Sequence, residues 1–284
     1  MAKSYPPPDY GTFIRINDLN VHVWSVGTGP PVILIHGFMG MAYDWRANVE
    51  QLGKHFHVYA PDLPGFGFSD KPLDFGYTSN RYAEFVVSFL DKYKLKRAVL
   101  VGNSMGGQIS LETCLRYPER VAGLVLVDSG GYPQSVEFLP FKLLGIPIID
   151  RMAMALVNRT VINIMLRKGI YFNSSFVTEE VVKNYNSVYG TAEARKIPPV
   201  VIRKMVKDEA YIASNLHNVE PPTLIIWGAG DRVISPRRAE MFRRDIKGAS
   251  LLTVPEAGHM PQVERAEIVN KAIIDFSYWC WSTW

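Results

Sequence analysis

The fold of this chain is decided by one stretch, Ala98-Val99-Leu100-Val101-Gly102-Asn103-Ser104-Met105-Gly106-Gly107. It opens with an aliphatic run typical of a buried strand, and the residues after it follow a helical pattern. The stretch predicts a strand, a sharp turn and a helix, with Gly-x-Ser-x-Gly on the turn. A serine on such a strained turn leaves almost no space for side chains at Gly102 and Gly106. Because the pattern alone occurs by chance in about one chain in ten of this length, its position between strand and helix carries the prediction.

Short aliphatic and β-branched runs recur on both sides of this stretch, and most end in Gly, Asp, Pro or His. Such runs are typical of buried parallel strands. They are Val32–Ile35, Val58–Pro61, Ala98–Val101, Leu124–Val127, Leu224–Trp227 and Leu251–Val254. Before them, Thr12–Ile16 and Val21–Val26 flank turn-forming residues and predict a hairpin. Because a stripe at helical spacing from Ala83 to Tyr93 separates two of the runs, we predict an α/β fold with a mostly parallel sheet flanked by helices.

One interval, from Gly131 to about His217, contains no convincing strand pattern. Its predicted helical segments are Leu139–Leu144, Ile148–Arg167, Val177–Tyr189 and Pro199–Asn215. The Thr178 hydroxyl is expected to cap one of these helices. The interval therefore predicts an all-helical cap, residues 131–217, inserted into a core formed by residues 1–130 and 218–284.

Ser104 has candidate partners for nucleophilic catalysis at two other strand ends. A serine hydroxyl needs a base to take its proton, and the base needs an acid to orient it. His259 follows the last predicted strand and Asp231 follows the strand before it, so both lie at the same carboxyl edge as Ser104. Asp128, at the end of Leu124–Val127, is a competing acid, but Asp231 also carries a Gly-rich turn. We therefore predict a catalytic triad of Ser104, Asp231 and His259.

Two backbone N–H groups are predicted to stabilise the oxyanion of the reaction. Met105 follows the serine and opens the helix, and Phe38 lies in the loop after a predicted strand. Removing one such donor typically costs about 3 kcal/mol of transition-state stabilisation. We expect His36 to brace the Phe38 loop, and Asp62 to fix the Gly-rich loop that follows it.

These motifs together resemble the α/β-hydrolase superfamily, in particular capped serine esterases and lipases. The matching motifs are His36-Gly37-Phe38, Asp62-Leu63-Pro64-Gly65-Phe66-Gly67-Phe68-Ser69, Gly102-Asn103-Ser104-Met105-Gly106-Gly107, Gly228-Ala229-Gly230-Asp231 and Gly258-His259. The resemblance covers essentially the whole chain, from the initial hairpin to the last helix. It implies an enzyme that hydrolyses carboxylic esters through an acyl-enzyme, and it implies no metal or organic cofactor.

Two alternatives to an esterase stay open. The motif Gly-Asn-Ser-Met-Gly-Gly is also typical of hydrolases that cleave a carbon–carbon bond in vinylogous diketones, the meta-cleavage products of aromatic rings. Those enzymes resemble one another in a Gly-Pro-Gly stretch and in a Trp after the catalytic His, whereas this chain has Phe38-Met39-Gly40 and Met260. The other alternative is a non-catalytic small-molecule binding protein on the same fold. Epoxide hydrolases and haloalkane dehalogenases need a carboxylate nucleophile, which Ser104 excludes.

The predicted substrate is a small apolar ester with a short to medium acyl chain. It would pass between cap and core, where the lining is aliphatic and Met-rich, with no evident run of cationic residues to bind a carboxylate. The residues predicted to contact it are Trp45, Asn103, Met260, Met152 and Leu156.

Composition excludes several other classes of protein. Hydrophobic residues make up 48% and charged residues 20%, as in ordinary globular proteins. The net charge of +4 is scattered, so we expect no nucleic-acid partner. Cys114 and Cys280 make neither a disulfide framework nor a Cys-rich metal site. Because the sequence shows no signal-peptide pattern and no membrane-spanning run, we expect a soluble, cytoplasmic protein.

The C-terminus is rich in aromatic residues. Three of the six tryptophans fall in the last six residues, Trp279, Trp281 and Trp284. Such a patch marks either a contact site for a partner or a helix that packs its rings on the core. The sequence leaves both interpretations open.

Overall fold

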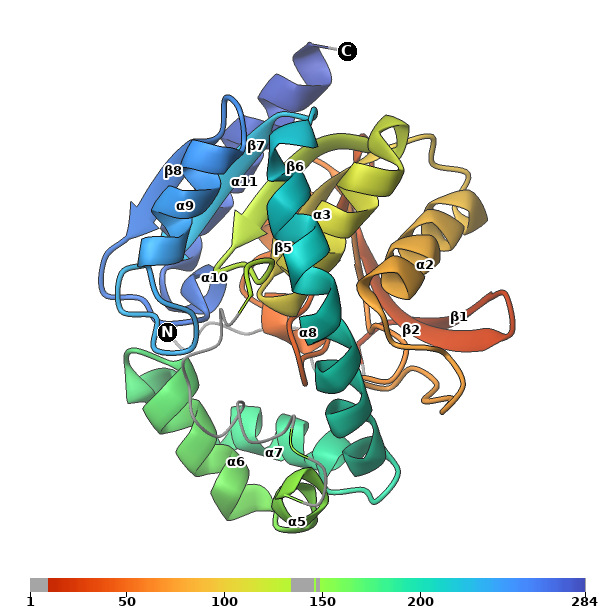
Figure 1. Cartoon of the computed structure of the whole chain (residues 1–284), viewed down its shortest axis with the longest axis vertical. Coiled ribbons are helices and arrows are strands. Elements are labelled where there is room, and N and C mark those ends of the chain that lie inside the picture. The colour runs from red at the N-terminus through yellow and green to blue at the C-terminus, as the bar shows by residue number, and fades with distance from the viewer. Residues whose placement is uncertain (1–9, 134–145, 147–148, 284) are drawn as a thin grey trace.

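The computed structural model describes residues 10–133, 146 and 149–283. They contain an eight-stranded sheet in the order β1-β2-β4-β3-β5-β6-β7-β8 (Figure 1). Its strands are β1 (Thr12–Ile16), β2 (Leu19–Val26), β3 (Pro31–Ile35), β4 (His57–Pro61), β5 (Ala98–Asn103), β6 (Val121–Val127), β7 (Thr223–Gly228) and β8 (Ser250–Val254). The pairs β1–β2 and β2–β4 are antiparallel and all others are parallel. The predicted α/β architecture with a mostly parallel sheet is confirmed.

Helices cover both faces of this sheet. They are α1 (Val49–Gly53), α2 (Ser79–Lys92), α3 (Met105–Arg116), α9 (Arg237–Asp245), α10 (Pro261–Glu264) and α11 (Ala266–Ser282). In Figure 1, α2, α3 and α9 lie in front of the sheet and α11 lies behind it. Every residue of β5 and β6 is buried, so the core lies between these central strands and the helices on either face.

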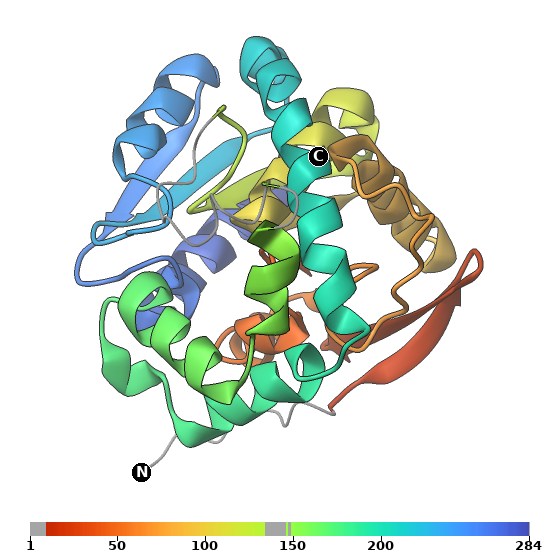
Figure 2. The same ribbon diagram turned by 60° about the horizontal axis from the view of Figure 1, so that its bottom comes forward.

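Between β6 and β7, residues 149–218 consist of helices joined by short turns, and we name them the helical segment. It consists mainly of α5 (Ile149–Ala155), α6 (Arg159–Met165), α7 (Glu179–Tyr189) and α8 (Ile197–Asn215). A π-helical turn, Leu166–Ile170, follows α6. In Figure 1, α5, α6 and α7 lie at the end of the molecule toward which the strands β6 and β8 point, and Figure 2 brings this end forward. The segment therefore faces the carboxyl edge of the sheet.

The predicted helix Ile148–Arg167 is wrong as a single helix. The chain leaves the helical path after Ala155, and the Asn158 side chain caps α6 by accepting from the N–H groups of Thr160 and Val161. The predicted Thr178 cap of α7 is present, with Oγ1 3.3 Å from the nitrogen of Val181. The predicted helix Leu139–Leu144 lies outside the described residues, and the bounds of the cap stay a prediction.

The C-terminal helix α11 packs on the sheet through small residues. A Cβ on Gly123 of β6 would lie 2.4 Å from Sγ of Cys280, so the glycine makes room for this side chain. Tyr278 hydrogen-bonds His55 at 3.0 Å, whereas the Trp279 ring is half exposed. Packing is therefore observed, and a contact role for the exposed rings stays a prediction. Trp284 lies outside the described residues. Within the described ranges, the helices are too short or too polar to cross a membrane.

Candidate active site

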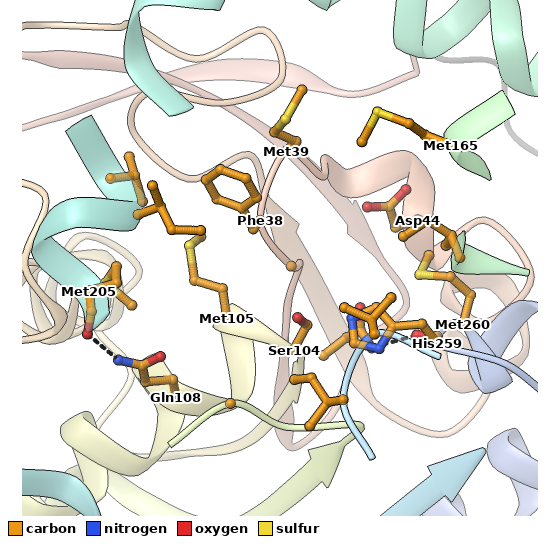
Figure 3. A pocket seen from close by; sticks show the side chains of 18 of the residues that line it. Phe38, Met39, Asp44, Ser104, Met105, Gln108, Met165, Met205, His259 and Met260 are labelled. Carbon is orange, nitrogen blue, oxygen red and sulfur yellow. Dashed lines mark hydrogen bonds between the residues drawn. The ribbon is translucent and has the colours of Figure 1, made fainter. Parts of the chain in front are cut away.

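Ser104 lies on the turn between β5 and α3, and its φ of +55° is unusual for a residue with a side chain. The glycines around it have no room for a Cβ. A Cβ on Gly102 would lie 2.3 Å from the carbonyl oxygen of Gly106, and one on Gly106 would lie 2.1 Å from that of Ile35. The turn therefore requires both glycines, and it presents Ser104 to the cavity seen in Figure 3.

The structure brings His259 and Asp231 together beside Ser104. His259 Nδ1 lies 2.8 Å from Asp231 Oδ2, and both side chains are buried. An ionised carboxylate only accepts, so this contact suits an imidazole that carries its proton on Nδ1 and leaves Nε2 without one. The other carboxylate oxygen, Oδ1, accepts from the N–H groups of Val233 and Ile234. Asp231 is thus fixed by backbone donors while it orients the imidazole.

The backbone of His259 is held from two sides. Its N–H donates to the carbonyl of Ile170 at 2.9 Å, which ties it to the helical segment. The Asn103 side chain donates to the carbonyls of His259 and Val127, both at 3.2 Å. Asn103, a predicted substrate contact, lines the cavity and also connects β5, β6 and the histidine loop.

The two predicted oxyanion donors belong to residues beside Ser104. Met105 is the first residue of α3, where an N–H has no acceptor within the helix. The loop of Phe38 lies against the serine turn, since a Cβ on Gly37 would be 3.1 Å from Cβ of Ser104. Phe38 and Met105 both line the cavity (Figure 3).

His36 and Asp62 hold these loops rather than reach the cavity. His36 Nε2 accepts from the N–H of Leu63 at 2.9 Å, and Nδ1 lies 2.8 Å from the carbonyl of Gly37. The ring must be neutral to do both, and burial lowers the pKa of His36 accordingly. Asp62 accepts from the N–H of Phe68 at 2.8 Å. Both residues have the bracing contacts that the sequence predicted.

Asp128, the competing acid, also lies at this edge of the sheet. Its Oδ1 accepts from the N–H of Gly228 at 2.9 Å, and the hydrogen bond to His259 belongs to Asp231 instead. Atoms of Asp128, Asp231 and His259 that could bind a metal ion lie within 4.8 Å of one another. Among the described residues, this is the one cluster of that kind. Two of these three groups are already joined by the hydrogen bond that orients the histidine.

A cavity reaches Ser104 between the sheet edge and the helical segment. The sheet side contributes Gly37, Phe38, Met39, Asp44, Asn103, Ser104, Met105, Gln108, Gly130, Val233, Ile234, His259 and Met260. The helical segment contributes Ile162, Met165, Leu166, Ile170, Tyr185, Tyr189, Val201, Ile202, Met205, Val206 and Glu209. Most of these side chains are aliphatic or Met, and the described lining includes two acids but no Lys or Arg.

Asp44 is one of these two acids, and Figure 3 shows its carboxyl group in the cavity. Its Oδ1 accepts from the Tyr185 hydroxyl of α7 at 2.6 Å, and its Oδ2 accepts from the N–H of Met41 at 3.1 Å. Burial raises the pKa of Asp44 from its ordinary value. Asp44 thus connects the core to the helical segment at the cavity wall.

The predicted substrate contacts are placed differently from one another. Met260 and Asn103 line the cavity. Trp45 is fully buried in the core and is not part of the described lining. Met152 on α5 and Leu156 just after it are 64% and 67% exposed, so both side chains point to solvent. The prediction that these three residues contact the substrate is therefore wrong for the described cavity.

Sequence reasoning missed the contribution of α8 and α7 to the cavity. Val201, Met205 and Glu209 recur every four residues, so they lie on one face of α8 and all line the cavity. In the sequence, Glu209 continues the apolar face of this helix, and this pattern could have predicted that the face lines a cavity. Tyr185 and Asp44 gave no comparable signal, since they are far apart in the sequence and meet only in the fold.

Comparisons with known proteins agree with this fold. A sequence profile described as the α/β hydrolase fold matches residues 30–147. The uncharacterized hydrolase YugF of Bacillus subtilis is 29% identical over 250 residues, which cover 86% of this chain and 89% of that protein. Lipase 3 of a Moraxella species is 29% identical, with 84% of this chain and 74% of the lipase covered.

A solved structure gives the same result. The meta-cleavage product hydrolase of Pseudomonas fluorescens IP01 superposes with a TM-score of 0.78 at 26% identity, covering 94% of this chain and 97% of that one. The eight-stranded sheet, the profile match and these similarities agree with one another. The chain therefore has the α/β-hydrolase fold and is similar to hydrolases of that superfamily.

Proposed function

We propose that this protein is a serine esterase that hydrolyses neutral carboxylic esters with apolar acyl chains of short to medium length. One observation carries the proposal. Ser104 lies on a strained turn beside a histidine that is 2.8 Å from a buried carboxylate, and both Ser104 and His259 face one mostly apolar cavity. This combination suits nucleophilic attack on an apolar acyl group.

The geometry supports an acyl-enzyme mechanism. Ser104 attacks the ester carbonyl while His259 Nε2 takes its proton, and Asp231 stabilises the imidazolium. The backbone N–H groups of Phe38 and Met105 hold the oxyanion. His259 then delivers the proton to the leaving alcohol, and a water molecule repeats the attack to release the acid.

The cavity supports the choice of substrate. The helical segment acts as a cap in this proposal, because it supplies one wall of the cavity over Ser104. Asp44 and Glu209 give the described lining an acidic character, and no Lys or Arg there offers a partner to an anionic acyl chain. Each methylene buried in such a site contributes about 0.8 kcal/mol until the pocket is full.

The runner-up is hydrolysis of a carbon–carbon bond in a meta-cleavage product, since a hydrolase of that name is among the similar structures. Met260 disfavours this reaction. Enzymes of that type resemble one another in a Trp after the catalytic His, whereas this chain has Met260 there, in the cavity wall. A binding protein without catalysis is the third reading, and it predicts retained binding with very slow turnover.

A panel of activated esters from acetyl to palmitoyl, run beside a ring-cleavage diketone, tests the proposal. We expect kcat/KM to rise from acetyl to butyryl or hexanoyl and then to fall, because a cavity of limited size accommodates a limited chain length. A monoester of a dicarboxylic acid should be a poorer substrate than the neutral ester of equal length. If the diketone is cleaved faster than every ester, the esterase proposal is wrong and the runner-up replaces it.

A further inference from the structure

A second carboxyl group lies beside Asp231 without a role in the mechanism above. Asp128 follows β6 and is fully buried, and one of its carboxyl oxygens lies within 4.8 Å of a carboxyl oxygen of Asp231. Its Oδ1 accepts from the N–H of Gly228, whereas its Oδ2 is buried with no hydrogen-bond partner in the structure. An acceptor oxygen that lacks a donor in such a place is costly if the group is ionised.

The charges around Asp128 make a second anion there unfavourable. Asp231 on the loop after β7 and Glu264 on α10 are acidic, and His259 is already the partner of Asp231. Burial, together with the charge of Asp231, raises the pKa of Asp128 well above its ordinary value. Two carboxyl groups this close share a proton more readily than they carry two charges.

The donors decide which of the two carboxyl groups holds the proton. Asp231 accepts from His259 and from two backbone N–H groups, so three donors stabilise its negative charge. Asp128 accepts from a single backbone N–H, that of Gly228. The charge therefore belongs on Asp231, and the proton belongs on Asp128.

We infer that Asp128 is a positioning residue that stays protonated at neutral pH and donates a hydrogen bond from its Oδ2 to the carboxylate of Asp231. The O–H at Oδ2 gives the unpartnered oxygen its hydrogen bond and adds a fourth donor to Asp231. Asp128 itself touches no substrate; it fixes the group that orients His259. This role rests on the proposed function of the triad for its kinetic consequence, but the proton on Asp128 does not.

Infrared spectroscopy tests the proton directly and needs no substrate. The difference spectrum between the unmodified protein and Asp128→Asn at neutral pH should contain the carbonyl band of a protonated carboxylic acid, shifted in D₂O. Asp245→Asn is the matched control, because Arg244 lowers the pKa of Asp245 to about 2 and its difference spectrum should show only an ionised carboxylate. A carboxylate band for Asp128 would overturn the inference.

Two replacements at position 128 test the hydrogen bond. The φ of +44° at Asp128 suits Asn and Gly, so neither variant adds backbone strain. Asp128→Asn keeps a neutral donor, whereas Asp128→Gly removes it and leaves the N–H of Gly228 unpaired. We expect kcat for esters in the Gly variant to fall about 10- to 100-fold below that in the Asn variant, with little change in KM.

The outcomes separate this inference from the proposed function. Equal losses in Asp128→Asn and Asp128→Gly would show that no donor at this position is needed and would overturn the positioning role. If Asp128→Asn lost activity on the order of 10⁴-fold while Asp231→Asn stayed active, Asp128 would be the acid of the triad instead. A protein that shows the protonated band and cleaves no ester would retain this inference and lose the proposed function.

Discussion

The carboxyl edge of the sheet and the helical segment are held by different kinds of contact. At the edge, backbone meets backbone: a Cβ on Gly106 would lie 2.1 Å from the carbonyl oxygen of Ile35, and one on Gly228 would lie 2.1 Å from that of Gly258. In the segment, side chains make the corresponding contacts, as in the hydrogen bond from Tyr185 to Asp44. Where backbone meets backbone, no residue with a side chain can replace the glycine. Where side chains meet, one side chain can be replaced by another. We therefore expect the residues of the proposed triad to be constrained at the edge, and the proposed substrate preference to depend on side chains of the segment that can be exchanged.

One backbone contact joins the two regions. The carbonyl of Ile170, at the end of the π-helical turn, accepts from the N–H of His259 at 2.9 Å. A Cβ on Gly258 would lie 2.7 Å from the same oxygen. The helical segment therefore helps to hold the histidine loop in addition to covering the cavity.

The largest expected effect is at the sheet edge. Replacing Ser104 with Ala should abolish ester turnover and labelling by a fluorophosphonate, because Ser104 carries the one hydroxyl group of the proposed triad. Loss of the nucleophile costs on the order of 10⁶-fold in kcat in a well-studied serine protease. Steady-state kinetics and mass spectrometry of the labelled protein measure both quantities.

Ser214→Ala is the control for this change. Ser214 is exposed on α8, where its hydroxyl donates to the carbonyl of Ala210, and the variant should be labelled normally. Labelling that persists in Ser104→Ala would show that another residue is the nucleophile. The proposal that the sheet edge carries the catalytic residues and the helical segment forms the cavity wall would then be wrong.

The strands were predictable because each is a compact run of aliphatic residues with polar or turn residues at its end. The bounds of β1 agree with the prediction, whereas β6 begins at Val121, three residues before the predicted start. The earlier residues include Gly123, which weakens a strand pattern and is present because Cys280 packs against it. That reason lies in the C-terminal helix, so local sequence does not contain it.

The triad residues were predictable for a related reason: they follow strands whose ends meet at one edge. The cavity wall was not. Met152 and Met165 are the same residue type in neighbouring helices, yet Met152 is exposed and Met165 lines the cavity. Which face of each helix points inward depends on the break after Ala155, and the apolar pattern continues through that break.

Replacing each of these two methionines tests the helical segment, and the expected effect is smaller than that of Ser104→Ala. Met165→Ala enlarges the cavity, so the preferred acyl chain should become longer by one or two methylenes. Each methylene that gains burial should raise kcat/KM about fourfold relative to the unmodified protein, in line with about 0.8 kcal/mol per methylene. Specificity profiles over the same ester panel measure the shift.

Met152→Ala makes the same chemical change on the solvent side of the segment. Because the Met152 side chain is 64% exposed and lies outside the described lining, its profile should match that of the unmodified protein. A shift in Met152→Ala as large as that in Met165→Ala would mean that the segment rearranges when substrate binds, and the division between cavity wall and solvent face would not hold.

The smallest expected effect is in the helical segment away from the cavity. Asn158 caps α6 through hydrogen bonds from the N–H groups of Thr160, at 2.9 Å, and Val161, at 3.1 Å. Asn158→Ala should lower the free energy of unfolding by about 1 kcal/mol, seen as a loss of a few degrees in Tm, and should leave kcat/KM for the preferred ester unchanged. Asn158→Asp keeps an acceptor for both N–H groups and should retain the stability. An Asp variant as unstable as the Ala variant would argue against the cap. A changed kcat/KM would mean that the stability of the segment affects the geometry at Ser104. The hydrogen bond between Ile170 and His259 would then be the contact that connects the two.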